Sequence, residues 1–210
     1  MTNADEECIV IVIDDDDHVR TAVSDLLRSV RLKVNSFASV PEFLKSRMPD
    51  VPSCLVLDVR LPGLSGLDLQ AELNKSDVQI PIVFMTAHGD VPMSVRAMKS
   101  GAVDFLSKPF RDQDLLDAVQ RGLEADRKRR ATTNVRQQLV VAYESLTPRE
   151  KEIMTLIAGG LMNKQIAGRI GVSVVTVKFH RGNIMRKLGA RTIAELVRMA
   201  DALGAQSSER

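Results

Sequence analysis

Short apolar runs alternate, through the first half of the chain, with stretches whose apolar residues recur every three or four positions. The run from Ile9 to Ile13 contains only β-branched residues, which is typical of a strand buried on both faces of a parallel sheet. Runs of strand length lie at residues 8–13, 33–35, 54–57, 82–85 and 103–106. Because a helical pattern follows each of them, we predict an α/β unit, a parallel sheet with helices on both faces.

The helical pattern after the last predicted strand is unusually long. It starts near Arg111, and neither Pro nor Gly interrupts the sequence from Leu123 to Tyr143. This stretch is charged and compatible with a helix, so we predict an extended helix that also serves as a linker. The expected domain boundaries are 1–125 for the α/β domain, 126–145 for the linker and 146–210 for a second domain.

From Leu146 onward the apolar residues follow only the helical period. Polar residues stand where helix caps are expected, and glycines follow three of the helical stretches. The expected caps are Thr147, Asn163, Ser173 and Thr192, and the expected stops are Gly159, Gly160, Gly171 and Gly189. Pro148 and Glu150 stand at the first and third helical positions after Thr147, in the order of a capping box. The pattern predicts a small all-α domain of four helices.

Charge divides the chain into two unlike halves. Residues 1–126 hold 13 Lys and Arg against 21 Asp and Glu, whereas residues 127–210 hold 16 against 6. An acidic half suits a site for cations or phosphate, and a basic half suits a surface that binds polyanions. Ordinary variation of surface charge is the alternative, and the size of the difference counts against it.

The two cysteines, Cys8 and Cys54, lie beside strand-like runs and are interpreted as reduced core residues. No apolar run approaches the roughly 20 residues of a membrane span. The polar start of the chain does not have the pattern of a signal peptide. We therefore expect a cytoplasmic protein without a membrane partner.

Four consecutive carboxylates, Asp14 to Asp17, follow directly on the first predicted strand. In open α/β sheets, ligands bind at the edge formed by the carboxyl ends of the strands. Crowded negative charges repel one another there unless a cation is bound, and Mg²⁺ prefers oxygen ligands. The alternative is an acidic cap that helps to start the next helix.

Three further residues at strand ends extend this pattern: Asp58, Thr86 and Lys108. A carboxylate can accept a phosphoryl group, and phosphoryl transfer depends on positioning and charge neutralisation. A divalent cation held by Asp14, Asp15 and Asp58 would neutralise phosphoryl oxygens, while Lys108 and Thr86 contact others. For each residue alone, the alternative is a structural role: a helix cap for Asp58, a polar strand position for Thr86 and a solvated loop position for Lys108. Together, in this order, they predict a phosphoryl-accepting site.

Residues 8 to about 125 resemble the receiver domain of bacterial two-component response regulators, down to the turn Lys108-Pro109-Phe110. The resemblance implies a five-stranded parallel (βα)5 fold in which a cognate sensor histidine kinase phosphorylates Asp58. It also implies a Mg²⁺ cofactor held by Asp15, Asp58 and the backbone carbonyl of Arg60, with Asp14 in support.

The same resemblance gives roles to residues around the acceptor. Thr86 and Lys108 would contact the phosphoryl oxygens, and Phe105 would be the switch aromatic that moves inward with Thr86. An ordinary core position is the alternative for Phe105. The acidic run is longer than the family pattern requires, so Asp16 and Asp17 are expected to start the next helix rather than to bind metal.

The second and third predicted helices of the basic half have the order of a helix-turn-helix, whose second helix enters the major groove of DNA. In that helix, the residues expected to face the core are Val174, Val177, Ile184, Met185 and Leu188. Those expected to face outward are Thr176, Lys178, Arg181 and Arg186, with Lys164 and Arg169 on the preceding helix. Positive charge there supplies affinity for phosphates. A solvated helical face is the alternative, and for His180 the alternative to a base contact is packing between helices.

Residues from about Leu146 to Leu203 resemble the LuxR-type helix-turn-helix, which typically contains the start Leu146-Thr147-Pro148-Arg149-Glu150 and the core Thr176-Val177-Lys178-x-His180. With the receiver-like half, the chain resembles response regulators of the NarL/FixJ family, nearer the FixJ-like branch. The resemblance implies a homodimer on paired half-sites of double-stranded DNA, with Lys178, Phe179 and Arg181 near bases or phosphates. Gly182 stands where members of the family carry a long side chain, so one potential base contact is missing. The DNA sequence that those members bind therefore cannot be assigned to this chain.

We therefore hypothesise a transcription regulator, not an enzyme, in which phosphorylation of Asp58 favours dimerisation and DNA binding. Two other classes stay open. One is a metal-dependent phosphatase that uses Asp14 as nucleophile. The other is a DNA-binding protein whose N-terminal domain senses a small molecule, or acts only as an unphosphorylated dimerisation scaffold.

Overall fold

The computed structural model describes residues 7–76, 78–87 and 91–204. Its contacts divide the chain into two units between Arg130 and Ala131. This division falls within the predicted linker, residues 126–145. Helix α5 (Asp112–Glu144) continues through it, as the sequence without Pro or Gly predicts.

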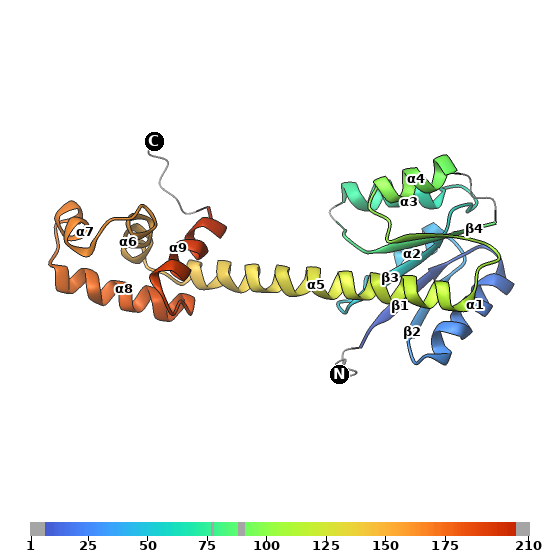
Figure 1. Cartoon of the computed structure of the whole chain (residues 1–210), viewed down its shortest axis with the longest axis horizontal. Coiled ribbons are helices and arrows are strands. Elements are labelled where there is room, and N and C mark those ends of the chain that lie inside the picture. Colours follow the sequence, from blue (N-terminus) through green and yellow to red (C-terminus); the bar gives the residue numbers. More distant parts are fainter. Residues whose placement is uncertain (1–6, 77, 88–90, 205–210) are drawn as a thin grey trace. The chain divides into compact units, whose positions relative to one another are not determined.

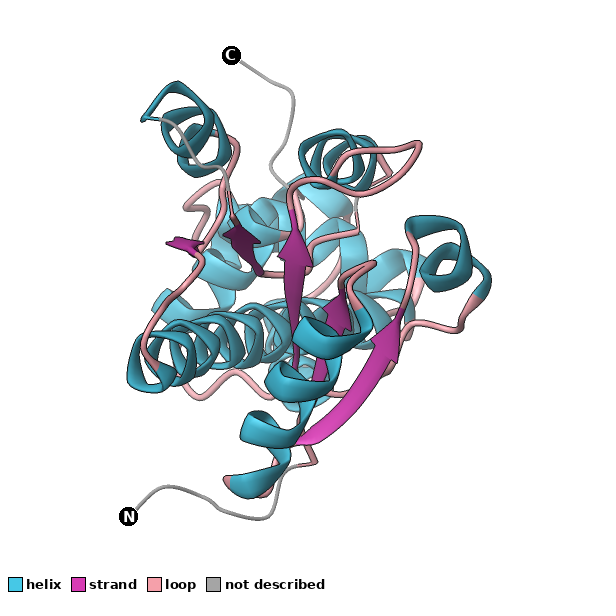
Figure 2. Cartoon of the chain, turned by 90° about the vertical axis from the view of Figure 1, so that its right-hand side faces the viewer, coloured by secondary structure: helices cyan, strands magenta, loops and turns pink. Residues whose placement is uncertain are grey.

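The first unit is built on a five-stranded parallel sheet with the strand order β2-β1-β3-β4-β5 (Figures 1 and 2). The strands are β1 (Ile9–Ile13), β2 (Lys33–Phe37), β3 (Ser53–Asp58), β4 (Ile82–Thr86) and β5 (Asp104–Ser107). The helices between them are α1 (Asp17–Ser29), α2 (Val40–Lys45), α3 (Gly66–Lys75) and α4 (Val91–Lys99), and α5 follows β5. The predicted (βα)5 fold is therefore confirmed.

Both faces of the sheet are buried, because successive side chains of a strand point to opposite sides. Along β1, Ile11 and Ile13 pack into the core under α2, α3 and α4, whereas Val10 and Val12 pack into the core under α1 and α5. Figure 1 shows these two helical layers on either side of the sheet. Cys54 is completely buried in the core under α1 and α5, as predicted, and burial raises the pKa of its thiol to about 12. Within the described parts of the chain, no helix is both long and apolar enough to cross a membrane.

A buried carboxylate fixes α5 to the amino end of β3. Asp126 is only 1% exposed, and it accepts the backbone N–H of Ser53 at 2.9 Å. The guanidinium groups of Arg129 and Arg130 also donate to Asp126, and Arg130 reaches on to Asp50. Asp126 therefore holds α5 against the amino end of β3, a few residues before the first unit ends at Arg130.

Replacing Asp126 with Ala is expected to destabilise the first unit by about 2–3 kcal/mol, because it leaves the Ser53 N–H and two arginines without their shared buried partner. Urea unfolding of the full chain would measure this as a lower midpoint for the first unit. The matched control is Asp117→Ala, which removes an exposed carboxylate of the same helix. Equal effects of the two substitutions would contradict the assigned role.

The second unit contains α6 (Pro148–Ala158), α7 (Asn163–Ile170), α8 (Val174–Leu188) and α9 (Ile193–Ala202). Thr147, Ser173 and Thr192 cap α6, α8 and α9 as predicted, and Thr147 forms a capping box with Glu150. The cap predicted at Asn163 is wrong, because Asn163 is the first helical residue of α7 and Met162 precedes it as N-cap. The side chain of Gln165 accepts the Met162 N–H at 2.7 Å, and the Met162 side chain makes no capping hydrogen bond.

These helices pack around a core to which the last turns of α5 also contribute Leu139, Ala142 and Tyr143. Val177, Ile184 and Leu188 of α8 are buried, as predicted, and Met185 is half-buried. Val174 is exposed instead of buried, because it lies at the first helical position, beyond the neighbouring helices.

A buried ion pair joins α6 to α8. Glu150 accepts a hydrogen bond from Lys187 at 2.6 Å and from the backbone N–H of Thr147 at 2.8 Å. Burial alone would raise the pKa of Glu150, but these bonds outweigh burial and hold its pKa below the usual 4.5.

We expect Glu150→Gln to destabilise the second unit by about 1.5 kcal/mol at neutral pH, since the charged bond from Lys187 is weakened. Because the folded-state pKa is lowered, the carboxylate stabilises the fold above the unfolded pKa, and this contribution is lost as the pH falls through the folded pKa. Hydrogen exchange of α6 amides should therefore differ between the variants near pH 7 and converge in acid. Glu152→Gln, at an exposed carboxylate on α6, is the control. A difference that does not change with pH would contradict the assignment.

Candidate functional site

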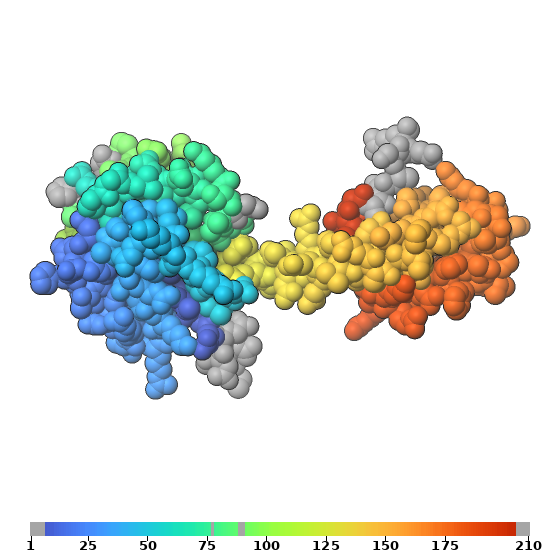
Figure 3. Space-filling model, turned by 180° about the vertical axis from the view of Figure 1, so that it is seen from behind, coloured from blue at the N-terminus to red at the C-terminus, as the bar shows by residue number. Residues whose placement is uncertain are grey.

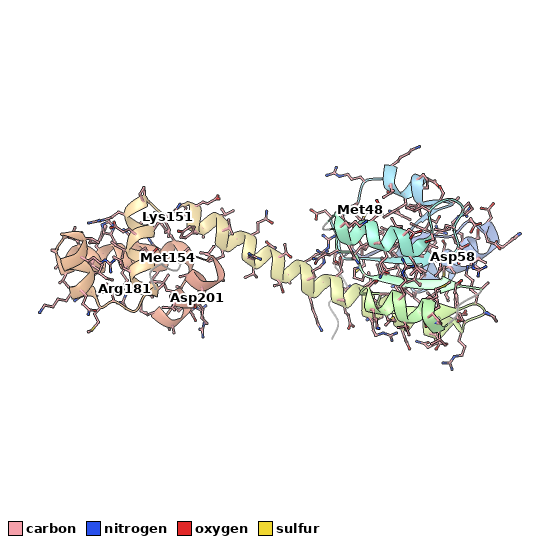
Figure 4. All side chains as sticks on the ribbon, turned by 90° about the horizontal axis from the view of Figure 1, so that it is seen from above. Met48, Asp58, Lys151, Met154, Arg181 and Asp201 are labelled. Atoms are coloured by element: carbon pink, nitrogen blue, oxygen red, sulfur yellow. The ribbon has the colours of Figure 1, made fainter. Side chains whose placement is uncertain are left out.

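The carboxyl ends of four strands carry the candidate site. Strand pairing places Ile13 beside Leu57, and Asp58 beside Met85, so that the ends of β1, β3 and β4 lie at one edge of the sheet. Strand β5 joins this edge through the pairing of Thr86 with Ser107. The side chains brought to this edge are Asp14, Asp58, Thr86 and Lys108, as predicted. Figure 4 labels Asp58 at one end of the first unit and Met48, which precedes β3, at the other.

Lys108 bridges the two buried carboxylates of the site. Its ammonium nitrogen lies 2.6 Å from Asp14 Oδ2 and 2.9 Å from Asp58 Oδ1. Asp14 is 1% exposed and Asp58 is 6% exposed. The backbone N–H of Lys108 donates to the carbonyl of Thr86 at 2.8 Å, and the Lys108–Pro109 peptide bond is cis. The lysine is therefore held at the tip of β5 by both its backbone and its side chain.

The electrostatics of the site favour a further positive charge. Burial raises the pKa of Asp58, and the neighbouring charge of Asp14 raises it as well, although Lys108 opposes both effects. Burial disfavours the charged form of Lys108, but the hydrogen bonds to Asp14 and Asp58 outweigh it and raise its pKa. Two carboxylates thus share one ammonium group, so a bound cation would relieve the repulsion between them.

The arrangement of the possible metal ligands differs in part from the prediction. In the described ranges, no three Asp, Glu, His or Cys side chains stand close enough together to hold a metal ion by themselves. Asp14, Asp15 and Asp58 therefore do not form the metal-binding cluster that the sequence predicts. Asp14 and Asp58 are instead bonded to Lys108. Mg²⁺ needs only one or two carboxylates and keeps several waters, so an oxygen-rich, negatively charged edge with an exposed Asp15 fits it.

Arg60 is exposed, and its backbone N–H donates to Asp58 Oδ2 at 2.8 Å. The bond holds the carboxylate that the sequence predicts as acceptor. The role predicted for the carbonyl of Arg60, as a metal ligand, remains a prediction.

Thr86 and Phe105 lie on the neighbouring strands β4 and β5. Thr86 is completely buried. Phe105 is half-buried against the core under α2, α3 and α4, with its ring centroid 6.3 Å from that of Phe84. This packing agrees with the interpretation of Phe105 as a core residue, and its role as a switch aromatic stays a prediction.

Two residues near the site were not singled out from the sequence. Arg20 of α1 donates to the backbone carbonyl of Asp14 at 2.7 Å, which fixes the segment after β1. Gly66 begins α3 so close to β3 that an added Cβ would stand 2.4 Å from the carbonyl oxygen of Asp58. In the sequence, the glycine in the turn after Asp58 is the feature that indicates this close approach.

Asp16 caps α1 by accepting the N–H groups of His18 and Val19, and Asp17 is the first residue of the helix. Both carboxylates therefore start the helix, as predicted. Bonds from these two backbone groups lower the pKa of Asp16. The cap and the candidate metal ligand are thus different members of the same acidic run.

The predicted DNA-binding residues divide into two groups. Lys164, Lys178, Phe179 and Arg186 are exposed. Thr176 is half-buried, with its hydroxyl 2.8 Å from that of the cap residue Ser173. Arg181 is also half-buried and donates to Asn163 of α7 at 3.2 Å, so it does not lie on the outward side expected from the sequence. Figure 4 labels Arg181 within the second unit.

His180 is half-buried, and its ring lies edge-on to that of Phe179, with the centroids 5.9 Å apart. Helix α8 lies along the lower edge of its unit in Figure 1, and the atoms coloured for this part of the chain lie along the lower edge of the unit in Figure 3. Lys178, Phe179 and Arg186 of α8 are exposed.

Models of two protein families match the two units. A model of the response regulator receiver domain matches residues 10–120, and a model of bacterial regulatory proteins of the luxR family matches residues 144–200. Nodulation protein W of Bradyrhizobium diazoefficiens is 56% identical over 203 residues, which cover 97% of this chain and 89% of that protein. Transcriptional regulatory protein FixJ of Azorhizobium caulinodans is 42% identical over 195 residues, or 93% of this chain and 92% of that protein.

The solved structure of the response regulator StyR has a TM-score of 0.84 and 49% sequence identity to this chain, and the match covers 93% of this chain and 98% of StyR. The sequence matches and this structural match extend over both units. The chain therefore belongs to the two-component response regulators of the NarL/FixJ family, transcription regulators with a receiver domain and a LuxR-type DNA-binding domain.

Proposed function

We propose that Asp58 accepts a phosphoryl group from a sensor histidine kinase in a Mg²⁺-dependent reaction. The observation that carries this proposal is the bridge from Lys108 to Asp14 and Asp58 at the carboxyl edge of the sheet. It joins a carboxylate nucleophile, a second carboxylate and a fixed positive charge in one small site. Phosphoryl transfer requires this combination of positioning and charge neutralisation.

In the transfer, an oxygen of the Asp58 carboxylate attacks phosphorus, and the bond from phosphorus to the imidazole nitrogen of the kinase breaks. The electron pair of that bond stays on the imidazole, and an acyl phosphate forms on Asp58. Lys108 neutralises a phosphoryl oxygen, and the hydroxyl of Thr86 contacts another. Asp15, Asp58 and the carbonyl of Arg60 would hold Mg²⁺, with Asp14 in support. The ion would add charge neutralisation that the protein side chains alone do not provide.

The acyl phosphate is proposed to change the balance between two conformations of the receiver. Contacts of the phosphoryl group with Lys108 and Thr86 favour one of them, and Phe105 follows Thr86 inward. Exposed apolar side chains on α4 support homodimerisation through the face formed by α4, β5 and α5. These side chains are Val91, Val95 and Met98. Dimerisation would bring two LuxR-type domains to paired half-sites on double-stranded DNA.

Incubation with radiolabelled acetyl phosphate tests the proposal directly. We expect label on the full chain with Mg²⁺ and none with a chelator, and the label should be lost in alkali, as expected for an acyl phosphate. Selection of bound DNA from a random pool, with and without acetyl phosphate, should give an enriched sequence whose recovery rises on phosphorylation. Equal labelling with the chelator would contradict the role of Mg²⁺.

The exposed fractions favour Asp58 over Asp14 as the nucleophile. Both carboxylates are bonded to Lys108 and accept a backbone N–H, but Asp14 is only 1% exposed, against 6% for Asp58. Steady turnover of p-nitrophenyl phosphate would favour the phosphatase, and a single labelling event per chain would favour the receiver.

A further inference from the structure

Asp15, the exposed carboxylate of the candidate site, lies between two peptide groups that are both held in place. The carbonyl oxygen of the peptide group before it belongs to Asp14, and Arg20 of α1 donates to this oxygen at 2.7 Å. The N–H of the peptide group after it belongs to Asp16 and donates to the Asp14 carboxylate at 3.0 Å. Because each peptide group is planar, fixing both of them leaves the backbone of Asp15 little freedom.

Arg20 is itself held from several directions. Its guanidinium group also forms an ion pair with Asp17, the first residue of α1, and only 18% of the Arg20 side chain is exposed. The backbone N–H of Arg20 donates to the carbonyl of Asp16 at 2.9 Å, and its carbonyl accepts the hydroxyl of the buried Ser24 at 2.7 Å. Arg20 thus joins the end of β1 to the first turn of α1, across the acidic run.

The shape of the guanidinium group suits this double contact. Its donors form a planar fork, so one nitrogen bonds the Asp14 carbonyl while another bonds the Asp17 carboxylate. A lysine carries the same charge, but its single ammonium nitrogen stands at the end of a flexible stem. Lysine at this position would therefore keep the positive charge and hold the peptide group between Asp14 and Asp15 less firmly.

Metal affinity depends on how well the ligands are placed before the ion binds. Mg²⁺ requires near-ideal octahedral geometry, and loss of a group that orients a ligand typically weakens metal binding roughly 10–100-fold. We propose that Arg20 is a positioning residue of the candidate site, which sets its affinity for Mg²⁺ by holding the peptide group between Asp14 and Asp15. The inference rests on the proposed function, because it requires that Asp15 is a ligand of Mg²⁺.

The charge of Arg20 and its positioning role affect Mg²⁺ binding in opposite directions. A guanidinium group near the site repels a cation, so its removal would strengthen Mg²⁺ binding if charge alone mattered. Removal also leaves the carboxylate of Asp17 without its counter-charge, which acts in the same direction. Loss of the hydrogen bond to the Asp14 carbonyl instead weakens Mg²⁺ binding, because Asp15 is then presented in several orientations. The direction of the change in affinity therefore distinguishes positioning from electrostatics.

Arg20→Gln in the full chain tests the inference, since glutamine removes both the charge and the fork of donors. The variant is titrated with Mg²⁺ alone, without a phosphodonor, and the backbone amide chemical shifts give the Kd for Mg²⁺. We expect this Kd to rise about tenfold. The matched control is Arg28→Gln, which removes the same charge from an exposed pair with Asp25 in the last turn of α1. The Kd of the control should not rise.

Labelling by acetyl phosphate over a range of Mg²⁺ concentrations gives a second measurement. Arg20→Gln should raise the Mg²⁺ concentration at half-maximal rate about tenfold. It should keep the maximal rate at saturating Mg²⁺, because Asp58 and Lys108 are unchanged. Arg20→Lys keeps the charge and one donor, so its half-maximal concentration should lie between those of the wild-type chain and Arg20→Gln. A purely structural role would instead lower the maximal rate together with the midpoint of urea unfolding, and this result would overturn the inference.

The outcomes separate this inference from the proposed function. If Arg20→Gln folds and binds Mg²⁺ as tightly as the wild-type chain, or more tightly, the inference is wrong and the proposed function stands. If Arg20→Gln does not fold, Arg20→Lys decides, and a wild-type Kd for Mg²⁺ in that variant would also overturn the inference. A wild-type chain that neither binds Mg²⁺ nor accepts label from acetyl phosphate would overturn the proposed function and the inference together.

Discussion

Asp58→Asn is expected to abolish labelling of the chain by acetyl phosphate. The amide has nearly the shape of the carboxylate, and its oxygen can still accept the N–H of Arg60 or the ammonium of Lys108. It lacks the anionic oxygen that attacks phosphorus, so the nucleophile is lost while the surroundings are kept. The measurement is acid-stable, alkali-labile radiolabel per chain after incubation with Mg²⁺, and the variant should fall to background.

The same substitution tests whether Asp58, and no neighbouring carboxylate, accepts the phosphoryl group. Asp25→Asn alters an exposed carboxylate of α1 and should leave labelling unchanged. In DNA selection, the D58N variant should recover the same amount of operator with and without acetyl phosphate. Label that persists on the D58N variant would mean that another carboxylate, with Asp14 the first to examine, accepts the phosphoryl group.

The fold could be predicted because its central strands are buried on both faces. Continuous apolar runs mark β1, β3 and β4, and their ends were predicted within one residue. The edge strand β2 was predicted only to residue 35, although it continues to Phe37. Its residues are exposed or half-buried, and Asn35 and Ser36 are two exposed polar residues in succession, so hydrophobicity gives a weak signal there.

The site could be predicted at the level of strand ends but not of side-chain contacts. Parallel strands bring their carboxyl ends to one edge whatever their side chains do, and this placed Asp58, Thr86 and Lys108 together. The bond from Lys108 to Asp14 depends on which charges are buried together, and no spacing along the chain contains that information. Arg181 is a different case, because it follows Val177 by four residues and precedes Ile184 by three, and both of these residues are completely buried. The helical spacing thus places Arg181 toward the inner side of α8, where it donates to Asn163.

Lys108→Met is expected to slow phosphorylation of Asp58 by about 100-fold, the usual cost of removing one well-placed donor from a site of developing charge. Methionine approximates the length of the lysine stem and removes the ammonium group, with its charge and its hydrogen bonds to Asp14 and Asp58. Without the ammonium, the hydrogen bond and charge that lower the pKa of Asp58 are lost, so its pKa rises further under the effects of burial and Asp14. The phosphoryl oxygens also lose a counter-charge.

The initial rate of labelling by acetyl phosphate at a fixed Mg²⁺ concentration measures this effect, with Lys75→Met at an exposed lysine of α3 as the control. Lys108→Arg restores positive charge without the compact geometry of an ammonium group, so it should recover part of the rate. A wild-type rate in the K108M variant would show that the bridge from Lys108 to Asp14 and Asp58 serves only to stabilise the fold. Slow labelling that Lys108→Arg partly restores would instead show that the positive charge itself takes part in the transfer.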